Sequence, residues 1–220
     1  MDFRPLIRSR RGMVAAVSAA AAILLVVGLV GAMRTLAGPA AAGLLDMNGR
    51  PVQLEPGDLP TRPSKSIPQP NRPMRFVVGA VGLNVPLEGL DVQDGEITPP
   101  GFTSAYLMQN IGVAPSQAAA GTVYVVMHSL RGGGMAPGNF LIDVDAQAPR
   151  MPDGTQVRVG DDTYAVTGWK AVRKTDVPTD STIWTSIPGR LVIITCLQTP
   201  SQKPSVDNMV ITAQLVDPAR

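Results

Sequence analysis

The 220-residue sequence has little of several residue types that functional sites commonly need. It contains one cysteine and one histidine, and aromatic residues make up 4% of the chain. A single cysteine excludes an internal disulfide framework, and one cysteine with one histidine falls short of the three protein ligands of a usual catalytic zinc site. The net charge of +2 and the scarcity of aromatic rings argue against nucleic-acid binding. No metal and no cofactor are expected.

Charged side chains are missing altogether from residues 12–33, where Ser18 is the clearly polar residue. The length of this run matches the roughly 20 apolar residues that cross a bilayer as a helix. Four arginines precede it, so residues 1–11 are predicted to be a cytoplasmic basic segment and residues 12–33 a transmembrane signal anchor. A cleaved signal peptide is the alternative, because Ala40–Ala42 offers small residues for cleavage, although its apolar region is usually only about 7–15 residues long. We therefore expect a single-pass protein of the cell membrane with an extracytoplasmic body.

Residues 34–73 carry eight prolines and few apolar side chains, which predicts a linker. Proline favours extended polyproline geometry, so this segment is either a semi-rigid spacer or a disordered tether. The folded domain is predicted to occupy residues 74–217.

Short strands separated by turns account for most of residues 74–217. Residues 121–127 and 191–196 are apolar runs that suit strands buried on both faces. Residues 156–159 and 164–169 alternate between apolar and polar side chains and are predicted to form a hairpin through Gly160-Asp161-Asp162. Residues 209–216 alternate in the same way, as half-buried strands do.

Turn dipeptides and the lack of long helices indicate the fold class. Asp94-Gly95 and Asp153-Gly154 are strong tight-turn signals. Residues 104–109 are compatible with a short helix, and residues 170–187 read as a long excursion with one helical turn. No long amphipathic helix is indicated, so we expect an all-β fold with short helices, arranged as an antiparallel barrel or sandwich.

Cys196 and His128 end the two buried runs, and each is the only residue of its type. Taken alone, a buried cysteine is commonly a small hydrophobic residue and a strand histidine a structural one. Their matching positions favour a functional pair, because an imidazolium stabilises a neighbouring thiolate and supplies a proton to a leaving group. The predicted reaction is acyl transfer through a thioester. The loop 129–139, with four glycines, lacks the spacing of a phosphate-binding loop and is interpreted as a flexible rim over a cleft.

The stretches around these two residues resemble those of the sortases, particularly the housekeeping-like classes of actinobacteria. The resemblance lies in Val126-Met127-His128-Ser129, Ile194-Thr195-Cys196 and Pro99-Pro100, together with residues 152–159 and 164–166. It implies an eight-stranded closed β-barrel and a cysteine transpeptidase. Cys196 would then attack a sorting motif such as Leu-Pro-x-Thr-Gly in a secreted protein, and His128 would protonate the departing amine. An amino group from a cell-wall precursor or a pilin lysine would resolve the thioester.

The sequence departs from the sortase pattern at one position. Sortases use an arginine on the strand after the cysteine, and here no arginine lies between Cys196 and the terminal Arg220. Asn208, Lys203 and Arg131 are the candidates to take its place, and Thr195, Asn208 and Arg131 are the predicted substrate-binding residues. Two hypotheses follow, an active transpeptidase or a sortase-fold protein that binds sorting peptides or an envelope partner without turnover.

Overall fold

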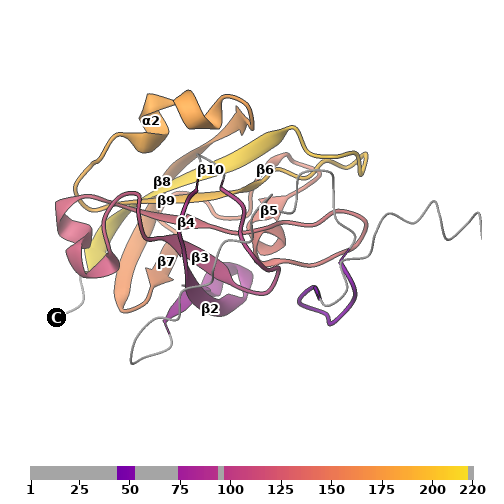
Figure 1. Cartoon of the computed structure of the whole chain (residues 1–220), viewed down its shortest axis with the longest axis horizontal. Coiled ribbons are helices and arrows are strands. Elements are labelled where there is room, and N and C mark those ends of the chain that lie inside the picture. Colours follow the sequence, from indigo (N-terminus) through magenta and orange to yellow (C-terminus); the bar gives the residue numbers. More distant parts are fainter. Residues whose placement is uncertain (1–43, 53–73, 94–96, 218–220) are drawn as a thin grey trace, which may run out of the picture. The chain divides into compact units, whose positions relative to one another are not determined.

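A computed structural model describes residues 44–52, 74–93 and 97–217 of the chain (Figure 1). The expected transmembrane anchor, most of the expected linker and the Asp94-Gly95 turn lie outside these residues. Within the described ranges, no helix combines the length and the apolar character that a membrane crossing needs.

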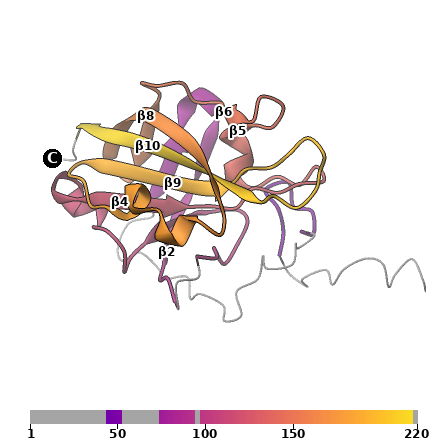
Figure 2. The same cartoon turned by 90° about the horizontal axis from the view of Figure 1, so that it is seen from above.

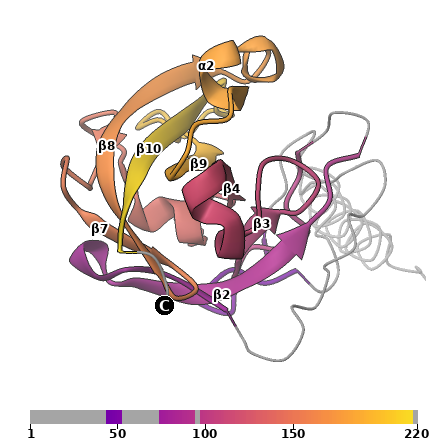
Figure 3. The same ribbon diagram turned by 90° about the vertical axis from the view of Figure 1, so that its left-hand side faces the viewer.

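The domain is a closed barrel of eight strands, which Figure 3 shows arranged in a ring. A short hairpin of β5 (Ile142–Asp143) and β6 (Ala148–Pro149) lies outside this sheet. In their order around the barrel, the strands are β1 (Arg75–Val78), β2 (Leu83–Leu90), β3 (Ala105–Met108), β4 (Thr122–Val126), β9 (Arg190–Cys196), β10 (Asp207–Asp217), β8 (Asp162–Arg173) and β7 (Gln156–Val159). The closed, mostly-β fold with short helices confirms the predicted class.

The barrel is not purely antiparallel, and in this respect the prediction was wrong. Strand β2 pairs with β3 in parallel, and β4 pairs with β9 in parallel. The remaining pairs are antiparallel, including the β1–β7 pair that closes the ring. Periodicity and turn signals locate strands but do not identify partners that are far apart in the sequence, so the direction of these two pairs could not be predicted.

Strands β4 and β9 are buried on both faces, as their apolar sequences indicate. One set of their side chains, including Val125 and Ile193, lies in the barrel interior, and both residues are fully buried. The other set lies in a second cluster on the outer face, which Ile183 and Val177 help to cover. These two residues come from the short helices α2 (Ser181–Trp184) and η4 (Val177–Thr179), outside the barrel wall (Figures 1 and 2).

The other short helices are η1 (Gly79–Val81), η2 (Pro115–Ala120) and η3 (Pro137–Phe140). The expected helix over residues 104–109 is wrong, since this segment contains β3. All four side chains of β3 are buried, with Ala105 and Leu107 in the interior cluster and Tyr106 and Met108 in the outer one. An apolar strand that is buried on both faces lacks the alternation by which a strand is recognised.

Strand β8 continues beyond Trp169, where the sequence analysis ended it. Its pairing with β10 extends as far as Arg173, opposite Asp207. The excursion before β9 is therefore shorter than expected, although it does contain the predicted single turn of helix, α2.

Residues 44–52 pack against the domain, although they lie within the segment expected to be a linker. The side chain of Val52 is only 3% exposed and lies in a cluster with Phe102, Leu130 and Ala136. Asp46 is also 3% exposed. The high proline content of residues 34–73 indicated a spacer, so the buried segment 44–52 was not predicted.

Candidate active site

The parallel pairing of β4 with β9 brings the ends of the two buried strands together. Val126 lies opposite Ile194, and the amide of Met127 donates to the carbonyl of Ile194 at 3.1 Å. His128 and Cys196 each follow two residues later, at the same end of the barrel. Neighbouring strands lie about 4.8 Å apart, so the pairing places the backbones of His128 and Cys196 close to each other.

Two further polar residues come from the next strands around the barrel. Asn208 of β10 is the direct cross-strand partner of Cys196. Lys174 follows β8, where its amide donates to the carbonyl of Val206 at 3.0 Å. His128, Cys196, Asn208 and Lys174 therefore belong to four successive strands of the barrel, β4, β9, β10 and β8, or to the residues directly after them.

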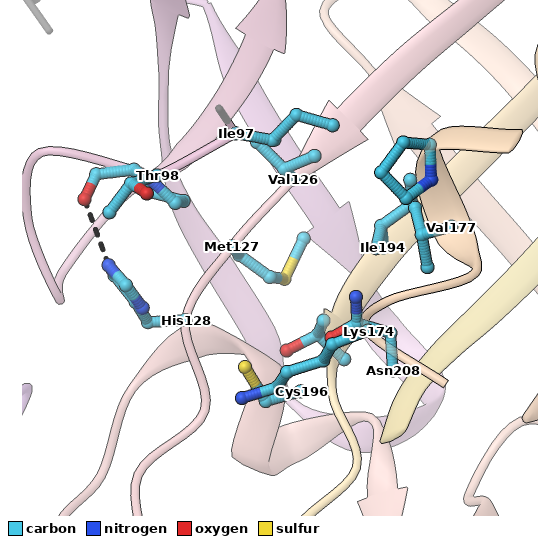
Figure 4. A pocket seen from close by; sticks show the side chains of 13 residues that line it. Ile97, Thr98, Val126, Met127, His128, Lys174, Val177, Ile194, Cys196 and Asn208 are labelled. Atoms are coloured by element: carbon cyan, nitrogen blue, oxygen red, sulfur yellow. Dashed lines mark hydrogen bonds between the residues drawn. The ribbon is translucent and has the colours of Figure 1, made fainter. Parts of the chain in front are cut away.

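All four residues line one open pocket of about 230 Å³ (Figure 4). Its base is apolar and belongs to the outer cluster, with Val126, Ile194 and Val177 contributing. The complete lining is Ile97, Thr98, Pro99, Val126, Met127, His128, Lys174, Val177, Pro178, Ile194, Thr195, Cys196 and Asn208.

Cys196 is partly exposed at the end of β9, which leaves its thiol accessible from the pocket. The segment around it is fastened to the residue after His128. Ser129 Oγ donates to the Cys196 carbonyl at 2.6 Å, and Gln198 Nε2 donates to the Ser129 carbonyl at 2.9 Å. These bonds join the two strand ends beyond the regular ladder.

His128 is 6% exposed, and its ring is held on two sides. Its Nε2 lies 2.8 Å from the carbonyl oxygen of Pro99, the contact drawn as a dashed line in Figure 4. A carbonyl only accepts hydrogen bonds, so this contact requires a proton on Nε2 and leaves Nδ1 as the position that can exchange one. The ring also stacks on Phe102, with centroids 4.3 Å apart and planes inclined by 23°.

Lys174 is the residue that the sequence analysis missed. Its half-buried side chain extends over the pocket in the direction of Cys196 (Figure 4). Among the described residues that line the pocket, it is the only lysine or arginine. Its position could have been found by extending the two-residue alternation of side chains from Val172, near the end of β8, to Lys174 just after it. Val172 lies opposite Asn208, so Lys174 is expected on the same face as Asn208.

The other predicted substrate-binding residues are placed differently from one another. Thr195 lines the pocket and is 2% exposed, and its Oγ1 has no hydrogen-bond partner among the described residues. Arg131 does not line the pocket, and its Nη1 donates to the Gln202 carbonyl at 3.2 Å. Lys203 is exposed and also lies outside the lining.

The glycine-containing loop after His128 does not form the expected rim. None of residues 131–139 lines the pocket described above. The loop packs instead against residues 44–52, since the amide of Met47 donates to the carbonyl of Met135 at 2.8 Å.

No protein-family model matches the sequence, and no curated protein matches it either. Solved structures of similar fold include sortase A of Listeria monocytogenes, with a TM-score of 0.46 and 16% identity over 66% of this chain and 86% of that one. Sortase A from Corynebacterium diphtheriae has a TM-score of 0.48 and 13% identity over 66% of this chain and 60% of that one. The pilus-related sortase C of Group B Streptococcus has a TM-score of 0.48 and 11% identity over 68% and 69% of the two chains.

Proposed function

We propose that this protein is a sortase-like cysteine transpeptidase. The observation that carries the proposal is that the only cysteine and the only histidine of the chain line one pocket at the ends of two paired strands. The site chemistry and the motif resemblance agree on acyl transfer through a thioester.

In the proposed reaction, the Cys196 thiolate attacks the carbonyl carbon of a peptide bond in an extended peptide. The tetrahedral intermediate collapses with cleavage of the C–N bond, and His128 gives its Nδ1 proton to the departing amine. An incoming amine then attacks the thioester and returns its proton to His128. The thiolate leaves, so that the cysteine and the histidine regain their starting states.

Three further residues complete the proposed site. Asn208 and Lys174 supply hydrogen-bond donors near the thiol, where negative charge develops on the carbonyl oxygen. Thr195 forms part of the pocket wall, and its buried Oγ1 makes no hydrogen bond among the described residues. A lysine presents a compact charge and no planar fork, so we expect it to stabilise charge with less geometric selectivity than an arginine does.

We further propose that the protein acts outside the cell while anchored by residues 12–33. The sequence pattern of four arginines followed by an uncharged apolar run supports this placement. The proposed substrates are secreted proteins with a C-terminal sorting motif, and the proposed acceptors are amines of a peptidoglycan precursor or a pilin.

The test is the capture of the acyl intermediate by hydroxylamine. The full-length protein is incubated with sorting-motif peptides and hydroxylamine, and the hydroxamate product is quantified by mass spectrometry. We expect product from the wild type and none above background from Cys196→Ala or His128→Ala. Absence of both hydroxamate and a Cys196 adduct with every sorting peptide would reject the enzymatic proposal.

A second candidate function is the binding of sorting-type peptides without turnover. It is favoured by the lack of an arginine between Cys196 and Arg220, where the resemblance leads us to expect the residue that stabilises the oxyanion. Peptide affinity measured by calorimetry separates the two functions. Tight binding that Cys196→Ala leaves unchanged, together with no hydroxamate, would support the binding protein.

A further inference from the structure

Residues 44–52 form a small closed hairpin. Leu45 and Pro51 make an antiparallel bridge, and the amide of Val52 donates to the carbonyl of Leu44 at 3.1 Å. Asp46 Oδ1 accepts hydrogen bonds from the amides of Asn48 and Arg50 at 2.9 and 2.8 Å. The segment therefore has an internal structure of its own, centred on one buried carboxylate.

The same carboxylate fastens the hairpin to the loop that follows His128. Asp46 Oδ2 accepts from the amide of Met135 at 3.1 Å, and Arg50 Nη2 donates to the carbonyl of Gly133 at 2.6 Å. Hydrogen bonds from the amides of Arg50, Met135 and Asn48 hold the pKa of Asp46 below its usual value, although burial opposes this shift. The carboxylate is ionised at neutral pH, so the fastening is in place under ordinary conditions.

The loop and the hairpin together enclose the aromatic ring on which His128 stacks. Phe102 is 2% exposed and shares a buried cluster with Val52, Leu130 and Ala136. Asn139 closes the loop, because its Oδ1 accepts from the amides of Leu130 and Ala136, both at 2.8 Å. Phe102 thus packs in one cluster with residues of both segments, in addition to its stacking on His128.

We propose that the 44–52 hairpin is a positioning element for His128 and acts through Phe102 and the 129–139 loop. Stacking on Phe102 sets the plane of the imidazole ring, and the Pro99 carbonyl then selects the Nε2–H form. If the hairpin detaches, Phe102 loses its support and the ring loses the orientation that presents Nδ1. The expected effect on turnover rests on the proposed function, whereas the orientation of His128 by the hairpin does not.

The test uses the full-length protein labelled with ¹⁵N-histidine, in which the single histidine gives unambiguous ring signals. The variants are Asp46→Ala, which removes the fastening, and Val52→Ala, a smaller truncation that keeps the proposal testable if Asp46→Ala does not fold. Asp143→Ala is the matched control, because Asp143 Oδ1 likewise accepts from nearby amides, those of Asp145 and Ala146, in a turn outside this cluster.

At a pH where the ring of His128 is neutral, we expect the Nε2–H tautomer in the wild type and in Asp143→Ala, and a mixture of the two tautomers in the hairpin variants. In the hydroxylamine assay, kcat should fall by up to about 10²-fold in the hairpin variants with little change in KM, because a small misplacement of a reacting group carries such a penalty. An unchanged histidine spectrum with unchanged kcat in a folded hairpin variant would overturn the proposal. A tautomer shift in a protein whose wild type makes no hydroxamate would reject the proposed function and leave the positioning role standing.

Discussion

Lys174 gives the pocket a positive charge that the strand after Cys196 does not supply. It extends toward Cys196 from the residue directly after β8, while the position opposite Cys196 on β10 holds the neutral Asn208. A fixed cation near a thiol favours the thiolate and the oxyanion that follows from its attack.

We predict that Lys174→Met lowers kcat for hydroxamate formation by about 10²–10³-fold, the usual effect of removing one oxyanion donor. Methionine retains much of the apolar stem, so the thermal stability should change little. Lys203→Met is the matched control, since Lys203 is exposed and does not line the pocket. Equal rates in the two variants would show that Lys174 has no part in the reaction.

Gly138 lies against both the His128 backbone and the Thr195 side chain. A Cβ at this position would lie 2.7 Å from the His128 carbonyl and 3.0 Å from Thr195 Cβ, and closer still to Thr195 Oγ1. We predict that Gly138→Ala destabilises the fold by about 1–3 kcal/mol, as overpacking does, and slows alkylation of Cys196 or changes its pH profile. Gly79→Ala is the control, because nothing lies within 4 Å of its added Cβ. Equal unfolding midpoints for the two variants would contradict this prediction.

Cys196 and His128 could be singled out from the sequence because each ends a run of aliphatic residues and each is unique in the chain, and the structure places both in the lining of one pocket. Asn208 was also identified, because it stands in the region where an arginine was expected. Lys174 was missed because β8 was ended at Trp169, although pairing with β10 carries the strand on to Arg173. Pairing with a strand that begins more than 30 residues later is a tertiary effect, and it cannot be predicted from the local pattern of apolar and polar residues.

At the scale of elements, α2 is held on the outer face by polar contacts with residues of β8 and β9. Asp180 caps its N-terminus by accepting from the amide of Thr182 at 3.0 Å and forms an ion pair with Lys170 of β8. The buried guanidinium of Arg190 donates to the carbonyls of Thr182 and Ile183 at 2.8 and 2.7 Å. Strand β9 therefore carries Cys196 at one end and anchors the covering helix at the other.

The Asp180 ion pair makes the attachment of α2 sensitive to acid. The hydrogen bond from Lys170 lowers the pKa of Asp180 to about 2, against an ordinary value of 3.8. A carboxylate whose pKa is lower in the folded state stabilises that state above the ordinary pKa, and this contribution is lost as the pH falls toward 2. We predict that the fluorescence of Trp184, whose Nε1 donates to the Val177 carbonyl at 2.6 Å, reports loosening of α2 between about pH 4 and pH 2.

The measurement is made in a Trp169→Phe background, so that Trp184 is the only remaining tryptophan. Asp180→Asn keeps a good capping residue but removes the titrating charge, so its fluorescence should depend less on pH in this range. Asp176→Asn serves as the control, because it removes a carboxylate that lies four residues earlier in the same excursion. Identical acid titrations of all three proteins would refute a role for the ion pair.

At the scale of the whole domain, the site depends on closure of the barrel. The interior cluster draws side chains from all eight strands, from Phe76 of β1 to Ile211 and Ala213 of β10. Strands β4 and β9 pair in parallel but are far apart in the sequence, so no turn joins one directly to the other. The sequence predicted the closed barrel through motif resemblance, but it did not indicate that the two key strands are neighbours.

Because one interior cluster serves every strand, the pocket and the barrel should be lost in one cooperative transition. We predict that urea unfolding followed by tryptophan fluorescence and by the NMR ring signals of His128, which is buried beside the pocket, gives coincident curves, as two-state behaviour requires. Ile193→Ala should shift both curves together and cost about 2–5 kcal/mol, because Ile193 is fully buried between Val125 and Ile211. Ile187→Ala is the matched control, since Ile187 is 41% exposed, and its curves should remain close to those of the wild type. A change in the His128 signals that precedes the fluorescence change would show that the ends of β4 and β9 open independently, and the pocket would then be a separate folding unit.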